Sequence, residues 1–150
     1  MNKRKVRVKV PASTANLGPG FDTLGMALNL YAWLEIGIAE KTVVRLYGDK
    51  MAGVPADKTN LIYRVAQSVF ERANEPHPEL EISMYSDIPL ARGLGSSAAA
   101  IVGSLVAANE LIGGKLSTDE LFQMANDLEH HPDNVAASLF GGLVAACCDG

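Results

Sequence analysis

Cysteine is scarce in this sequence, and long hydrophobic runs are lacking. The 150 residues include 2 cysteines, Cys147 and Cys148, and two adjacent residues in an apolar run do not make a disulfide framework. No stretch approaches the roughly 18 apolar residues of a membrane-spanning helix. The basic first residues are not followed by the apolar segment of a secretory signal. We therefore expect a cytoplasmic protein with reduced cysteines and no membrane partner.

An excess of positive charge is lacking as well. The formal net charge is -4 at pH 7, so no broad basic field attracts nucleic acid, and we expect no nucleic-acid partner. Hydrophobic residues make up 48% of the chain and charged residues 20%. This composition excludes a disordered chain and suffices for one domain with a hydrophobic core. Any phosphate would have to be bound by local geometry.

Alternation of apolar and polar residues predicts strands at four places. These segments are residues 5–10, 32–38, 42–47 and 80–85. A turn at 39–41 would join the second and third as a meander. The apolar run 143–148 predicts a core strand, and its position near the last residue suggests a domain cut short there. Residues 11–28 are rich in glycine and proline, which predicts a loop.

Helical spacing of apolar residues predicts three helices. The first covers 60–74, and the second, 97–112, contains so many small and apolar residues that it should be buried on most sides. Candidate caps for the first helix are Asp57, Thr59 and Asn60. The third helix begins at a capping box of Ser117 and Glu120 and ends before Pro132. A short helical or turn segment follows, so the sequence predicts a domain that mixes α and β structure.

The strongest motif is a glycine-rich segment between the fourth predicted strand and the second helix. Its residues are Pro89, Leu90, Ala91, Arg92, Gly93, Leu94, Gly95, Ser96, Ser97, Ala98 and Ala99. Gly93 and Gly95 allow the backbone to approach a ligand closely, and the amides at a helix start favour an anion. The segment lacks the lysine of a Walker loop and the third glycine of a dinucleotide fingerprint. We interpret it as a phosphate-binding loop; the alternative is a tight turn with packing glycines and capping serines.

This segment matches the pattern PxxxGLGSSAA and resembles the phosphate-binding motif of the GHMP kinases. That family is named for galactokinase, homoserine kinase, mevalonate kinase and phosphomevalonate kinase. Two further segments resemble its homoserine kinase branch. Residues 11–28, PASTANLGPGFDTLGMAL, are similar to the first motif of that branch, and residues 131–134, HPDN, are similar to its HxDN element. The three motifs occur in the order of the family.

The resemblance implies a two-layer α/β fold of the α+β type. A mixed sheet would carry helices on one face, as in the second domain of a ribosomal protein. Residues 1–150 would form the amino-terminal, ATP-binding domain, without the carboxyl-terminal domain of the family. The implied reaction is the ATP-dependent phosphorylation of L-homoserine to O-phospho-L-homoserine, a step toward threonine, with Mg2+ as a cofactor. Homoserine kinases often dimerise, so the resemblance also suggests a homodimer.

The resemblance also implies roles for individual residues. The residues in contact with L-homoserine would be Asn16, Asp22, His131, Asp133 and Asn134. The magnesium ligands would be Ser97, or less favourably Ser96, and Glu129. The catalytic group would comprise Asn134, Glu129 and Asp22. By type alone, asparagine and aspartate are also common turn residues, and a glutamate at a helix end is commonly solvated.

No residue is a compelling general base. Asp22 and His131 are candidates by type, and catalysis by positioning without a base is equally open. Asp133 would either orient its neighbours or contact the substrate. The other explanation for this element is a capped turn, in which Pro132 sets φ and Asn134 caps the next segment.

One residue departs from the homoserine kinase pattern. His130 stands where that branch more often has glycine, and a histidine at positive φ would cost about 1 kcal/mol. Together with Glu129, His131 and Asp133 it could suggest a zinc site, but adjacent histidines project in different directions and their spacing matches no zinc pattern. Other functions stay open: a catalytically silent nucleotide-binding fragment, a GHMP kinase for a sugar or mevalonate, or a nucleic-acid-binding module of the same fold.

Overall fold

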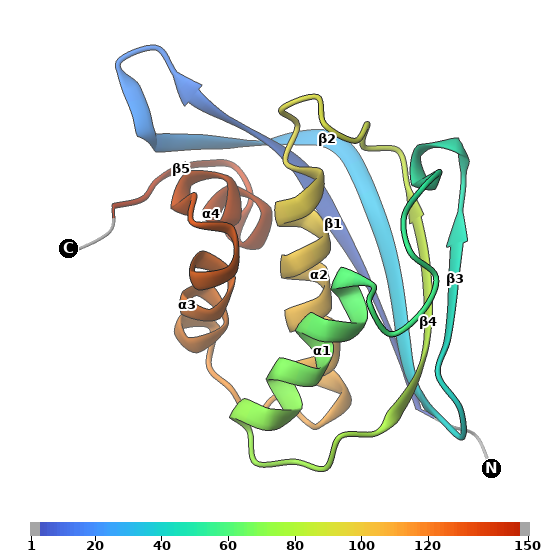
Figure 1. Cartoon of the computed structure of the whole chain (residues 1–150). Helices are drawn as coiled ribbons and strands as arrows, with labels where there is room; N and C mark the ends of the chain where they lie inside the picture. The colour runs from blue at the N-terminus through green and yellow to red at the C-terminus, as the bar shows by residue number, and fades with distance from the viewer. Residues whose placement is uncertain (1–3, 148–150) are drawn as a thin grey trace.

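Within residues 4–147, which the computed structural model describes, a five-stranded sheet runs through the protein and the helices cover one of its faces (Figure 1). The strands are β1 (Lys5–Leu17), β2 (Gly20–Ala39), β3 (Val43–Tyr47), β4 (Glu79–Ser86) and β5 (Leu143–Ala145). The helices are α1 (Leu61–Arg72), α2 (Ser96–Leu111), α3 (Thr118–Glu129) and α4 (Pro132–Phe140), with a short 3-10 turn, η1, at Asp49–Met51. The expected mixed sheet with helices on one face is confirmed.

The strand order is β1-β2-β4-β3, and β5 pairs with β2. β2 is antiparallel to β1, β4 and β5, whereas β3 runs parallel to β4. The predicted meander of β2 and β3 is therefore wrong, because β4 lies between them. Parallel strands need a long crossover connection, and the segment that contains α1 supplies it between β3 and β4.

Residues 11–28, predicted as a loop, form strand instead. β1 and β2 continue through this segment as a long hairpin that turns at residues 18–19 and extends past the helices in Figure 1. The pairing shifts register after Pro11 and after Ala15, and Asn16 has a left-handed φ of 58°. Proline is tolerated because bulges interrupt the ladder there. The turn-forming residues therefore mark irregularities within a strand pair.

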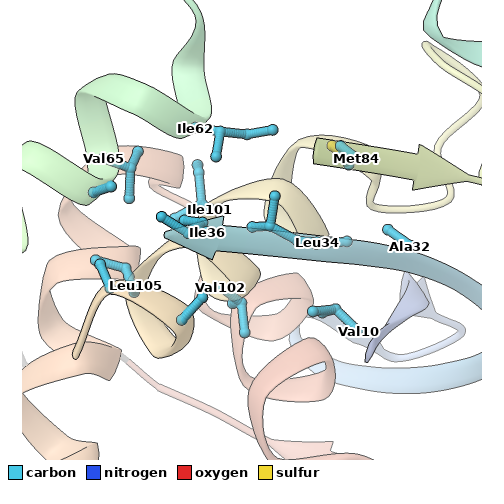
Figure 2. Close-up of a cluster of buried hydrophobic side chains, with 14 of the residues drawn as sticks. Val10, Ala32, Leu34, Ile36, Ile62, Val65, Met84, Ile101, Val102 and Leu105 are labelled. Atoms are coloured by element: carbon cyan, nitrogen blue, oxygen red, sulfur yellow. The ribbon is translucent and has the colours of Figure 1, made fainter. Parts of the chain in front are cut away.

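The core lies between the sheet and the helices, and Figure 2 shows the part of it formed by the sheet, α1 and α2. Val10 and Ile36 from the sheet are buried in one cluster with Ile101 and Leu105 from α2. As predicted, α2 is buried on most sides, because it packs on β1, β2 and the three other helices. Gly103 permits the close approach to the sheet, since a Cβ there would lie 3.0 Å from Cγ2 of Val10.

The helix caps agree with the sequence. Of the three candidates for α1, Asn60 is the cap: its Oδ1 accepts the amide of Ile62 at 2.8 Å. Its Nδ2 donates to the carbonyl of Pro55 at 2.6 Å and so also holds the chain that leads into the helix. Ser117 and Glu120 form the predicted capping box of α3. These local signals fix where both helices begin.

The strand predicted at 143–148 is shorter and more exposed than expected. β5 pairs with residues 24–26 of β2, and Leu143 is 67% exposed, so the prediction of a core strand is wrong. Cys147 is a free, exposed thiol, and Cys148 lies outside the described residues. Among the described helices, none is long and apolar enough to cross a membrane.

At the start of β4, Glu79 joins two other segments. It accepts hydrogen bonds from Nζ of Lys58 at 2.6 Å and from the amide of Thr42 at 2.8 Å. The hydrogen bond from Lys58 stabilises the carboxylate most, and those from the Thr42 hydroxyl and amide add to it. The pKa of Glu79 therefore falls from 4.5 to about 2. This cluster connects the beginning of β3 with the loop that precedes α1.

Candidate active site

The glycine-rich segment forms the loop between β4 and α2, as predicted. Three of its residues have left-handed φ angles: Ala91 at 54°, and Gly93 and Gly95 at 69° each. α2 begins at Ser96 and has no acidic residue in its first turn. The first amides of a helix lack intrahelical partners and carry the positive end of the helix dipole. The loop therefore presents donors and partial positive charge suited to an anion.

The two loop glycines have different surroundings. A Cβ at Gly95 would overlap Oγ of Ser13 and lie 3.2 Å from the Ser13 amide nitrogen. At Gly93 no atom lies within 4 Å of the position of a Cβ. Packing therefore explains Gly95, as the alternative interpretation of packing glycines expected for this position. Gly93 faces open space and leaves room for a ligand.

The two expected metal ligands are in contact. Glu129 is the last residue of α3, and its Oε2 accepts a hydrogen bond from Oγ of Ser97 at 2.9 Å. Both are oxygen donors of the kind that magnesium prefers, so this pair fits the ion. Among the side chains that the structure describes, no three of His, Cys, Asp or Glu form a metal-binding group. A magnesium ion at this pair would take its other ligands from phosphate and water.

Asn134 is connected to the glycine-rich loop through Ser13 of β1. Oγ of Ser13 donates to Oδ1 of Asn134 at 2.9 Å, and the Ser13 amide donates to the carbonyl of Leu94 at 3.0 Å. Ser13 is fully buried, and Asn134 lies in the first turn of α4. The three motifs found in the sequence therefore meet at one place: β1, the loop before α2, and the start of α4.

The residues around Asn134 set the start of α4. His131, an exposed residue, occupies the N-cap position, and Pro132 is the first residue of the helix. Asn134 therefore lies inside the helix and is not its cap. Asp133 is 2% exposed and its Oδ1 accepts the Asn134 amide at 2.9 Å, which favours an orienting role for this carboxylate. His130 has a φ of 58°, so it occupies the strained conformation that glycine would relieve.

The two remaining predicted residues lie toward the hairpin tip. Asn16 is exposed and lies three residues beyond Ser13 in β1, roughly 10 Å along a strand. The backbone of Asp22 belongs to β2, and its side chain lies outside the part of the chain that the structure describes. The positions of Asn16 and Asp22 near the substrate thus stay predictions.

A cavity beside the loop was missed by the sequence reading. Its volume is about 190 Å³, and it lies between the start of α2, the end of β4 and the segment 51–62. The residues that line it are Met51, Val54, Asn60, Leu61, Ile62, Met84, Ser86, Leu90, Ser96, Ser97 and Ala100. The sequence held one signal for this cavity: apolar residues such as Met51 and Val54 lie outside any periodic segment. The cavity offers an apolar space next to the anion-binding donors.

Comparison with known proteins agrees with these features. The family described as GHMP kinases N terminal domain matches residues 60–142. The homoserine kinase of Moorella thermoacetica is 50% identical over 143 residues, which cover 95% of this chain and 48% of that protein. The crystal structure of homoserine kinase from Cytophaga hutchinsonii superposes with a TM-score of 0.84 at 31% identity and covers 99% of this chain and 50% of that one.

A more distant structure shares the fold. The mevalonate kinase of Methanococcus jannaschii superposes with a TM-score of 0.74 at 17% identity, covering 97% of this chain and 54% of that chain. The chain spans about half the length of the curated relatives it matches. Because the family match covers more than half of its residues, the chain belongs to the GHMP kinase family.

Proposed function

We propose that this chain is the nucleotide-binding part of a homoserine kinase, which transfers the γ-phosphoryl group of ATP to L-homoserine in threonine biosynthesis. The observation that carries the proposal is the contact of Ser97 with Glu129 at the start of α2. It lies in a chain that is 50% identical to a homoserine kinase. The products would be ADP and O-phospho-L-homoserine.

The loop supports binding of the nucleotide phosphates. The amides at the start of α2 would donate to phosphate oxygens, and the open space at Gly93 would let the phosphates reach the backbone. The adjoining apolar cavity of about 190 Å³ has room for part of a nucleoside. Ser96 and Ser97 line this cavity and also begin α2 at the end of the loop. One nucleotide could therefore place its nucleoside in the cavity and its phosphates at the loop.

Ser97 and Glu129 would hold Mg2+ against the phosphates. A bound magnesium ion would offset the negative charge that the phosphate oxygens carry during transfer. The role of the chain is to keep a hydroxyl and a carboxylate adjacent, which the 2.9 Å hydrogen bond between them supports.

Asn134 and His131 would position the acceptor. The hydroxyl oxygen of homoserine would bond to the γ-phosphorus as the bond to the ADP oxygen breaks, and the hydroxyl proton would leave to water or a base. Asn16 and Asp22 would bind the polar groups of the amino acid. Phosphoryl transfer depends chiefly on alignment and charge stabilisation, so fixed donors at the acceptor suffice for a large part of catalysis.

Isothermal titration of the chain with Mg-ATP, alone and with L-homoserine, tests the proposal. We expect one Mg-ATP site and tighter binding of homoserine when the nucleotide is present. Ser97→Ala should weaken Mg-ATP binding about tenfold, a change of about 1.4 kcal/mol. Ser83→Ala, a hydroxyl deletion away from the site, is the matched control. A Gly95→Val variant is unsuitable because its side chain would also strike Ser13.

The other outcomes separate the alternatives. A folded chain that binds no nucleotide would contradict the proposal. Binding of Mg-ATP together with mevalonate or galactose, but not homoserine, would indicate another GHMP kinase. Binding of nucleotide with no acceptor at all would indicate a silent nucleotide-binding fragment.

A further inference from the structure

Ser13 is a polar residue with an unusual position in β1. Its side chain is fully buried, next to Ala12, which is also fully buried. Its amide donates to the carbonyl of Leu94 in the phosphate loop, and its hydroxyl donates to Oδ1 of Asn134. One residue therefore holds the phosphate loop with its backbone and the start of α4 with its side chain.

We propose that Ser13 is a positioning residue, whose hydroxyl orients Asn134 toward the phosphoryl acceptor while its backbone anchors the phosphate loop. The inference rests on the proposed function, because it assigns Asn134 to the acceptor side of the same site. It adds a residue that none of the motif roles includes. The backbone contact of Ser13 would serve nucleotide binding, and its side-chain contact would serve binding of the acceptor.

The hydrogen bond from Ser13 to Oδ1 leaves the amino group of Asn134 available as a donor. An asparagine side chain has one acceptor oxygen and an amino group with two donors. The Ser13 hydroxyl uses one of the two acceptor positions of the oxygen at 2.9 Å, and both donors of the amino group are left for another partner. Asn134 would thus act as a donor toward an oxygen of the acceptor or of the transferred phosphoryl group.

Packing alone does not explain the hydroxyl. A buried hydroxyl costs free energy unless it is hydrogen-bonded, and an alanine would fill nearly the same space beside Gly95. The hydroxyl therefore serves the bond to Asn134. The backbone bond from Ser13 to Leu94 does not depend on the side chain, so a change to alanine should leave the phosphate loop in place.

Ser13→Ala separates the two roles. In a titration of the chain we expect Mg-ATP affinity within twofold of the wild type, whereas homoserine affinity measured with nucleotide present falls about tenfold. Ser13→Thr keeps a hydroxyl and should restore most of the homoserine affinity. Thr14→Ala removes the neighbouring hydroxyl and is the matched control, expected to change neither affinity.

A ligand-free measurement tests the contact directly. The side-chain amino signals of Asn134, identified by their loss in Asn134→Ala, should shift in the nitrogen-proton NMR spectrum of Ser13→Ala and stay in place in Thr14→Ala. Unchanged Asn134 signals, or an equal loss of both affinities in Ser13→Ala, would overturn the assignment of Ser13. If the wild-type chain binds no homoserine, the proposed function fails, while the NMR result still decides whether Ser13 orients Asn134.

Discussion

The glycine-rich loop, residues 89–97, has a packed side and an open side, and small residues serve a different purpose on each. On the packed side, Gly95 lies against Ser13, which in turn binds Asn134. On the open side, Gly93 faces empty space and Ser97 is exposed. The same small residue types therefore serve interior packing on one side and access for a ligand on the other. Steric substitutions should reduce stability more on the packed side than on the open side, and loss of a polar side chain on the open side should reduce Mg-ATP binding.

The two glycines give the largest expected contrast. Gly95→Ala places a methyl group onto Ser13 at a φ of 69°, so we expect a loss of about 3 kcal/mol in the free energy of unfolding. Gly93→Ala has the same φ but open space, and should cost only about 1 kcal/mol. Urea denaturation of both variants measures the difference. Equal losses would remove the distinction between the two sides.

The polar side chains of the open side should affect Mg-ATP binding more than stability. Glu129→Gln keeps the shape of the side chain that accepts from Ser97 but removes its charge. We expect the free energy of unfolding to stay within about 0.5 kcal/mol and Mg-ATP affinity to fall about tenfold, or about 1.4 kcal/mol. Glu110→Gln, an exposed position on the same helix as Ser97, serves as a control. Unaltered magnesium-dependent binding in Glu129→Gln would exclude this carboxylate as a ligand.

His130 follows Glu129 as the C-cap residue of α3 and should give a smaller effect. Its φ of 58° is unfavourable for a residue with a Cβ, whereas glycine gains freedom in the unfolded chain. We expect His130→Gly to raise the free energy of unfolding by about 0.5 kcal/mol. Asn74→Gly, at a φ of 55°, is the comparison, with a smaller gain because asparagine tolerates this region. A destabilised His130→Gly would show that the imidazole makes a contact that outweighs the strain.

Glu79 provides a pH-dependent control far from the loop. Its pKa is lowered to about 2 by Lys58 and Thr42, so the folded state favours the carboxylate. The resulting stabilisation is fully present above the unfolded pKa of about 4.5 and is lost as the pH falls toward 2. In urea titrations, the free energy of unfolding should be higher for the wild type than for Glu79→Gln at pH 7. The two values should converge as the pH falls from 4.5 to 2. A difference that does not change with pH would mean that ionisation of Glu79 contributes nothing.

Local features of the fold could be predicted from the sequence, and pairings between distant residues could not. The capping box of Ser117 and Glu120 and the buried α2 follow from neighbouring residues alone. The insertion of β4 between β2 and β3 depends on contacts between segments far apart in the chain. The hairpin over 11–28 was missed because bulges use the same residues as loops.

The site shows the same division. The glycine-rich loop was located from the sequence, and family resemblance paired Ser97 with Glu129, which are in contact. Their roles toward phosphate and magnesium stay predictions. Ser13 was missed because its role depends on a partner 121 positions away. The cavity near Met51 was missed because three segments build it. Sequence patterns therefore locate motifs, whereas the contacts that join the motifs require the folded chain.

Hydrogen exchange of the chain with and without Mg-ATP tests most directly whether the open side of the loop binds the nucleotide. The account predicts that bound nucleotide slows exchange of the amides at residues 93–98, where the loop meets the start of α2, and leaves the outer strand β3 unaffected. Binding that protects other segments, or no protection at 93–98 in a folded chain, would contradict it.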